Sequence, residues 1–136
     1  MLKQVLVVAV LIGVGWSGSA GAQQAAGAPK PEPIKRTVLQ KFDVPGTNYE
    51  TVIGIAEIAP GVNIGRHTHP GAESGYLLDG DMTLIVANQP DKPLKAGESY
   101  QVPVGAVHDA RSGEKGARVI ATYVVEKGKP LAAPAQ

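Results

Sequence analysis

Three histidines and one nearby glutamate are the residues whose types and spacing can do chemistry. His67 and His69 are two residues apart, and side chains at that spacing point to the same face of a β-strand. Glu73 follows after a turn-prone Pro-Gly pair, and His108 follows a Pro-x-Gly turn. Three imidazoles and one carboxylate suit one divalent transition metal, such as Mn, Fe, Cu, Ni or Zn. The alternative is that each histidine is an ordinary surface or hydrogen-bonded residue.

This assignment leaves no histidine for acid–base catalysis. The chain has no cysteine, which excludes thiolate ligands, a cysteine nucleophile and disulfides. Four protein ligands around an octahedral metal leave two positions for water, substrate or O₂. Tyr100 and Tyr123 can reach the same pocket, but core packing is their default interpretation. Gln101 and Asp109 are weaker candidates for supporting a metal-bound histidine, and Arg66 is expected to face away from the metal.

Short strands punctuated by glycine and proline must position these residues. The 17 glycines and 11 prolines make up about a fifth of the 136 residues, and helical periodicity is almost absent between residues 36 and 126. This pattern is typical of a small sandwich or barrel. The expected strands are 37–43, 49–58, 64–69, 75–78, 82–87, 93–95, 100–102, 107–111 and 117–126.

Two segments resemble the motifs of the cupin superfamily. Residues 61–80 fit the first motif, G(X)5HXH(X)3–4E(X)6G, and residues 97–108 fit the second, G(X)5PXG(X)2H. Ser112 stands where the second motif usually ends in Asn, which is not a metal ligand in the family. The resemblance implies an all-β fold, a single cupin jelly-roll β-barrel. It also implies that one metal is bound by His67, His69, Glu73 and His108.

The two ends of the chain are expected to lie outside this domain. Residues 1–22 have the positive start, the apolar centre and the small residues of a signal peptide, so we expect cleavage after Ala22 and a periplasmic or secreted protein. The apolar run is too short to span a bilayer, so no stable membrane anchor is expected after cleavage. The predicted parts are a flexible linker (23–34), the cupin domain (35–127) and a flexible C-terminal tail (128–136).

Two classes of function fit these observations. The favoured one is a metal-dependent enzyme acting on a small organic molecule, with dioxygenase-like oxygen chemistry first and a lyase or isomerase next. The alternative is a noncatalytic module that binds a small ligand or a metal. A net charge of +1 argues against a nucleic-acid partner. A homodimer would stabilise a domain whose core is this small.

Overall fold

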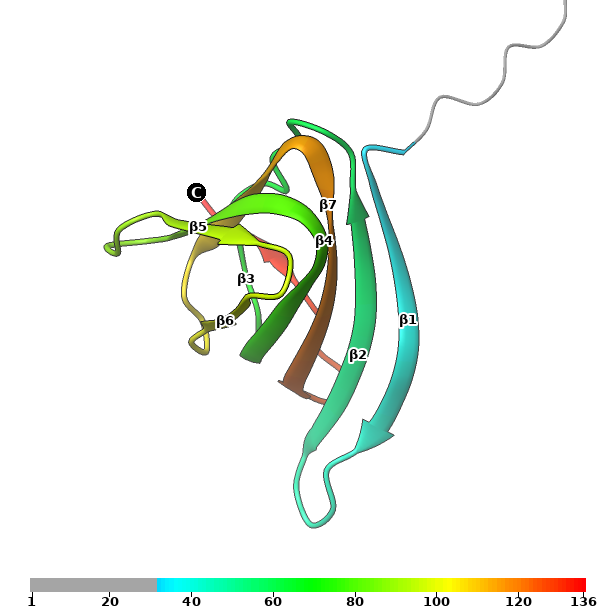
Figure 1. Cartoon of the computed structure of the whole chain (residues 1–136). Coiled ribbons are helices and arrows are strands. Elements are labelled where there is room, and N and C mark those ends of the chain that lie inside the picture. Colours follow the sequence, from blue (N-terminus) through cyan, green and yellow to red (C-terminus); the bar gives the residue numbers. More distant parts are fainter. Residues whose placement is uncertain (1–31) are drawn as a thin grey trace, which may run out of the picture. The chain divides into compact units, whose positions relative to one another are not determined.

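The protein, seen in a computed structural model, is described over residues 32–136 (Figure 1). The predicted signal peptide (1–22) and residues 23–31 of the predicted linker lie outside the described residues. Every regular element from residue 32 to residue 136 is a strand, and no helix in this part of the chain could cross a membrane. The strands are β1 (Ile34–Asp43), β2 (Tyr49–Ile58), β3 (His67–Thr68), β4 (Gly71–Val86), β5 (Lys92–Lys95), β6 (Ser99–Val102), β7 (His108–Glu126) and β8 (Ala133–Pro134).

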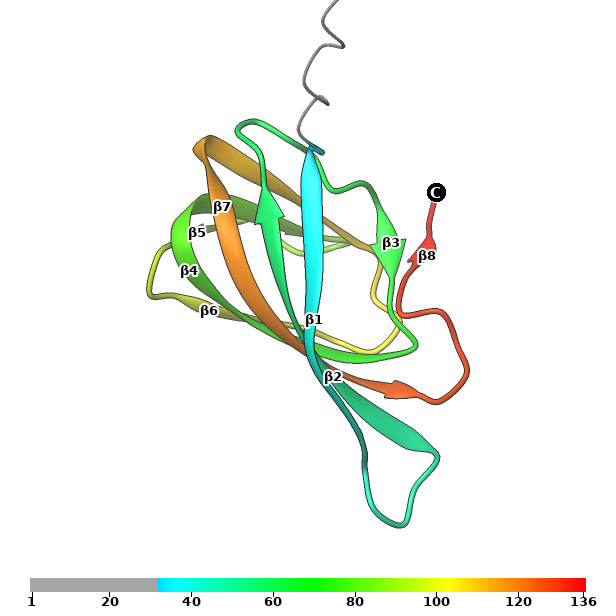
Figure 2. The ribbon, with the colours of Figure 1, turned by 90° about the vertical axis from the view of Figure 1, so that its right-hand side faces the viewer.

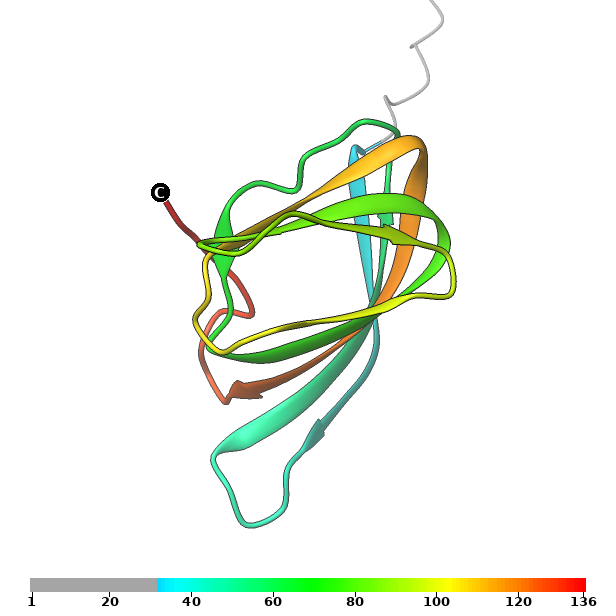
Figure 3. The same ribbon diagram turned by 60° about the vertical axis from the view of Figure 1, so that its left-hand side comes forward.

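The long strands β4 and β7 form the framework of one curled antiparallel sheet. They pair with each other over most of their lengths, while β4 also pairs with β5 and β6. On the other side of β7 lie β2 and then β1, which is an edge strand; β7 also pairs with β3. The sheet curls into a half-open barrel (Figure 3). The predicted all-β jelly-roll fold is therefore confirmed.

Both framework strands bend where the sequence predicts turns. Turns are predicted at residues 79–81 and 112–116, but β4 and β7 continue through these segments and their register shifts around Gly80. Gly80 and Gly116 have positive φ angles of 76° and 78°, and a Cβ at Gly80 would lie 2.1 Å from the Gly116 carbonyl oxygen. The two turn predictions are wrong, because glycines let the paired strands bend together instead of ending.

One face of the sheet forms the core and the walls of the site. Register partners across neighbouring strands share a face, so the residues of one row lie side by side. The buried apolar side chains on the inner face include Val52, Leu77, Val102, Val119 and Ala121. On the outer face large apolar side chains remain accessible, among them Phe42, Tyr76 and Val124 at 49%, 45% and 39% exposure.

The C-terminal segment adds a strand beside the first two histidines. In this part of the predicted tail, β8 pairs antiparallel with β3, where His67 is opposite Pro134 (Figure 2). The Ala135 amide also donates to the Arg66 carbonyl at 3.0 Å. The segment therefore satisfies backbone groups that the edge of β3 would otherwise leave unpaired.

Candidate metal centre

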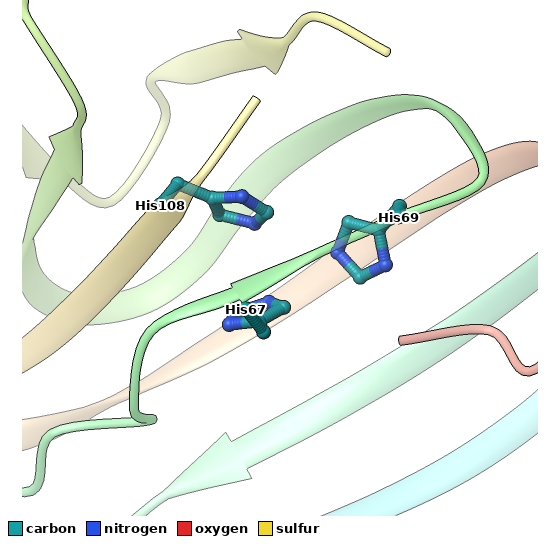
Figure 4. A group of neighbouring side chains, drawn as sticks. All are labelled: His67, His69 and His108. Carbon is teal, nitrogen blue, oxygen red and sulfur yellow. The ribbon is translucent and has the colours of Figure 1, made fainter. Parts of the chain in front are cut away.

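The four predicted ligands come together from three strands and the residue after one of them. His67 begins β3, and His69 is the first residue after that strand. Glu73 lies in β4, and His108 begins β7. One ring nitrogen from each of the three histidines lies within 4.8 Å of the others, and Figure 4 shows the rings gathered around a common space. His108, which is far from His67 and His69 in the sequence, meets them because His67 and His108 are register partners.

Backbone carbonyls fix the orientation of all three rings. Each Nδ1 faces a carbonyl oxygen, and a neutral imidazole that donates from Nδ1 carries its lone pair on Nε2. This tautomer follows from the hydrogen-bond network. The acceptors are Gly65 for His67 at 2.7 Å, Leu131 for His69 at 2.6 Å, and Ala106 for His108 at 2.9 Å. The chain therefore presents three Nε2 lone pairs for a ligand or a metal.

Glu73 brings a negative charge to the same point. Its Oε2 lies 3.0 Å from His69 Nε2 and 3.3 Å from His108 Nε2, and the side chain is buried. Burial alone would raise the pKa of Glu73, but the adjacent His108 and His69 rings and the hydroxyl donated by Tyr100 outweigh burial and lower this pKa to about 2. The carboxylate is therefore ionised at neutral pH.

Two buried polar atoms at the centre lack hydrogen-bond partners. They are His69 Nε2 and Glu73 Oε2, which face each other at 3.0 Å. With the His69 proton on Nδ1, both atoms are acceptors, and burying such a pair without a proton or cation is costly. A divalent cation would satisfy both atoms, and imidazole nitrogen with carboxylate oxygen is a donor set that transition metals accept. The residues present thus fit a metal.

The pKa values of His67 and His108 are shifted in opposite directions. Burial is the largest influence on His67 and lowers its pKa, which keeps the imidazole neutral at neutral pH. Burial also acts to lower the pKa of His108, but the Glu73 carboxylate and the Ala106 carbonyl outweigh it and raise that pKa. A proton on His108 is therefore the natural competitor of a metal at this site.

A tyrosine on β6 holds the second oxygen of Glu73. Tyr100 donates its hydroxyl to Glu73 Oε1 at 2.8 Å across the cross-strand neighbour Gly75. A Cβ at Gly75 would lie 2.3 Å from the Tyr100 ring, so only glycine leaves room for this path. Sequence reasoning gave Tyr100 a core-packing role, because nothing in the local pattern connects it with Glu73 across strands.

Asp109 supports the loop that orients His67. Its Oδ1 accepts the Gly65 amide at 2.9 Å, and the Gly65 carbonyl is the group that faces His67 Nδ1. Gln101, the other candidate for such support, is exposed and pairs with Ser74 on the outer face. Asp109 thus acts on the site through one intervening backbone residue.

Ser112 explains the departure from the second motif. It is buried, its hydroxyl donates to the Ala59 carbonyl at 2.6 Å, and its Oγ accepts the Val62 amide at 3.0 Å. These bonds hold the turn that leads from β2 toward the histidines. The serine is therefore structural and lies outside the ligand set.

A cavity of about 590 Å³ opens beside the four residues. Its walls are mainly apolar. Tyr123 lines it with its ring 4.8 Å from the His69 ring, and Arg66, expected to face away, also contributes to the lining. Leu131 and Pro134 of the C-terminal segment form part of the wall. The Leu131 carbonyl has no side-chain signature, so sequence reasoning had no means of finding it.

The comparisons with known proteins agree with this architecture. The cupin domain family model matches residues 54–126, which include all four predicted ligands. No curated protein matches the chain. The match to the family therefore covers the framework strands and the site, and it ends before the C-terminal segment.

Solved structures share the fold at low sequence identity. The DMSP lyase DddQ from Ruegeria pomeroyi has a TM-score of 0.65 and 15% identity, and the match covers 76% of this chain and 52% of the lyase. An uncharacterized conserved protein with a double-stranded beta-helix domain from Klebsiella pneumoniae has a TM-score of 0.61 and 24% identity, covering 80% of this chain and 90% of that one. Recombinant oxalate oxidase in complex with glycolate has a TM-score of 0.59 and 21% identity, covering 78% and 57%. This chain spans about half the length of the lyase, and these likenesses show the fold alone.

Proposed function

The chain belongs to the cupin superfamily, and from this premise we propose that it is a metal-dependent enzyme acting on a small organic molecule. One observation carries the proposal: three Nε2 lone pairs and an ionised carboxylate converge beside an apolar cavity. His67, His69, His108 and Glu73 would hold the metal. When bound, a divalent transition metal supplies Lewis acidity and, if it is redox-active, one-electron chemistry with O₂.

The protein's own groups would bind and orient the substrate. The apolar walls exclude water and accept the carbon skeleton of a small molecule. Burial is the main cause that raises the pKa of both Tyr100 and Tyr123, and Glu73 raises both further, so each phenol stays protonated at neutral pH. Tyr100 is committed to Glu73, and the Tyr123 hydroxyl, which also lies near Glu73, would be the hydrogen-bond donor toward a substrate oxygen.

Dioxygenase-like oxygen chemistry is the reaction class we favour. Apart from the four ligands, the titratable side chains that line the cavity are two tyrosines and two arginines, and none of these is a base at neutral pH. A reaction driven by proton abstraction would therefore lack an obvious base. Solved structures with this fold include an oxalate oxidase, which supports the proposal of redox chemistry.

A lyase or isomerase is the second candidate, and Tyr123 is the observation that favours it. A buried phenol beside His69 can hold a proton at its Oη and exchange it with a substrate. A DMSP lyase is among the proteins with this fold. If neither class of reaction occurs, the alternative is a noncatalytic module that binds a small ligand or a metal.

Metal reconstitution of the purified protein tests the proposal. Apo-protein loaded separately with Mn, Fe, Ni, Cu and Zn is expected to bind one equivalent, measured by elemental analysis. His69→Ala and Glu73→Gln should sharply reduce the metal content, while Glu57→Gln, an exposed carboxylate on β2, should leave it unchanged. One equivalent of metal in both ligand variants would overturn the site.

Turnover assays then separate the reaction classes. Oxygen uptake with diketones, flavonols and phenols should appear with a redox-active metal and vanish with Zn. Product formation without oxygen uptake, supported by Zn, would point to the lyase or isomerase class. A Tyr123→Phe variant should retain most of the oxygen uptake but lose most of a proton-transfer activity.

A further inference from the structure

We propose that Arg36 is an anion-binding group of the cavity, so that the substrate is a small organic acid with a second polar group. In this arrangement the metal-binding group of the substrate lies at the histidines, and its carboxylate or a similar anion lies at the Arg36 guanidinium. The inference rests on the proposed function, because one end of the substrate is placed at the metal.

The register of the sheet turns Arg36 toward the cavity. Arg36 on β1 is opposite Ala56 on β2, which is opposite Val119 on β7. Cross-strand partners share a face, and Val119 is a core residue with 3% exposure. Arg36 accordingly lines the cavity, whereas the adjacent Lys35 lies on the other face and pairs with Glu57 at 3.5 Å.

The guanidinium has no ion-pair partner among residues 32–136. The ion pairs in this part of the chain engage the other β1 cations, Lys35 and Lys41, but not Arg36. Glu73 is the one carboxylate among the described residues that line the cavity, and it is held by Tyr100. An unpaired guanidinium beside apolar walls is well suited to a planar carboxylate, which it can bind through two parallel hydrogen bonds.

Arg36 and the histidines line the same cavity. Tyr123 lines it as well and packs against His69, with the ring centroids 4.8 Å apart. One ligand in the cavity can therefore meet both the guanidinium and the histidine end.

Apolar wall separates the two polar ends. The cross-strand row between Arg36 and Tyr123 contains Val38 and Ala121, and Val52 is the register partner of Tyr123. All three apolar residues line the cavity. The cavity volume of about 590 Å³ is within the range of small-molecule sites. The complementary ligand thus has two polar ends, at least one of them anionic, and a short apolar middle.

Calorimetric titration of the Zn-loaded protein tests this assignment without turnover. The probes are malonate, succinate, glutarate and adipate, each compared with the monocarboxylate of the same chain length. The wild-type protein should bind at least one dicarboxylate more tightly than its monocarboxylate. Arg36→Ala should reduce that preference about tenfold or more, as expected for loss of a charge-assisted pair, while Arg36→Lys should retain part of it.

Lys35→Ala is the matched control, since it removes a cation from the other face of the same strand. It should leave dicarboxylate binding unchanged. Equal binding by the wild type and Arg36→Ala, or no dicarboxylate preference in a wild type that holds Zn, would overturn the inference. Failure of the wild type to bind Zn would instead overturn the proposed function, and equal Zn content in the two proteins shows that Arg36→Ala remains folded.

Discussion

At the scale of single residues, the site depends on groups that orient the ligands as much as on the ligands. The HxH spacing and the two cupin motifs predicted the ligand set, and the structure brings the three histidines together with Glu73 Oε2 beside His69 and His108. The hydrogen bond from Tyr100 across Gly75 to Glu73 could not be predicted from the sequence, because it depends on the register of β4 with β6. Local patterns do not predict the partner of a side chain on another strand.

Tyr100→Phe is expected to weaken metal binding with the ligands intact. Loss of the hydroxyl removes the bond that holds Glu73 Oε1, and loss of such a supporting contact costs roughly tenfold in metal affinity. Competition with a chromophoric chelator measures the effect. Tyr76→Phe, on the exposed outer face, is the control and should match the wild type; equal affinities for the Tyr100 and Tyr76 variants would contradict the role of the hydroxyl.

Asp109 offers a test of support through the backbone. Asp109→Ala removes the acceptor of the Gly65 amide and should lower metal affinity about tenfold, because the carbonyl that orients His67 is no longer fixed. Asp109→Asn keeps an oxygen acceptor and should retain most of the affinity. If the Ala and Asn variants are equally weak, the charge of Asp109 matters instead of its hydrogen bond.

At the scale of elements, the sequence predicted strand positions better than strand continuity. The bounds of β2 match the predicted residues 49–58, since one Pro-Gly pair lies before the strand and another lies after it. The β4 and β7 strands each include a predicted turn, because cross-strand pairing lets glycine-containing segments bend without ending. The pairing of β8 with β3 joins a short Ala/Pro-rich segment to a ligand strand, and that composition carries no strand signal.

Removal of the C-terminal segment is expected to damage the metal site. A chain that ends at Gly128 loses the Leu131 carbonyl and leaves His69 Nδ1 without its acceptor. We expect a fall in Zn affinity of roughly 10- to 100-fold, the range for loss of such orienting contacts, measured by chelator competition. Leu131→Ala is the matched control, because it keeps the carbonyl while shortening the side chain.

Two outcomes distinguish the explanations for that deletion. Wild-type Zn affinity in the shortened chain would show that the segment has no orienting role. Equal losses in the deletion and in Leu131→Ala would assign the effect to the side chain in the cavity wall instead of the carbonyl.

At the scale of the whole molecule, the half-open barrel leaves an apolar outer face. Phe42 and Val124 lie in one row on that face and are about half and two-fifths exposed. The homodimer expected from the small core remains a prediction. If the protein is a homodimer, light scattering should give a dimeric mass. The Val124→Glu variant should shift toward monomer, because a buried unpaired charge opposes association. A wild type that is monomeric at every concentration tested would contradict it.

The central claim is that the four residues hold one metal through three Nε2 atoms and the Glu73 carboxylate. Anomalous diffraction from crystals of the Zn-loaded protein tests it most directly. The claim predicts a single peak at ligand distances of about 2.0–2.2 Å from His67, His69 and His108 Nε2 and from a Glu73 oxygen. A peak bound elsewhere, or no peak at the histidines in crystals containing excess Zn, would contradict it.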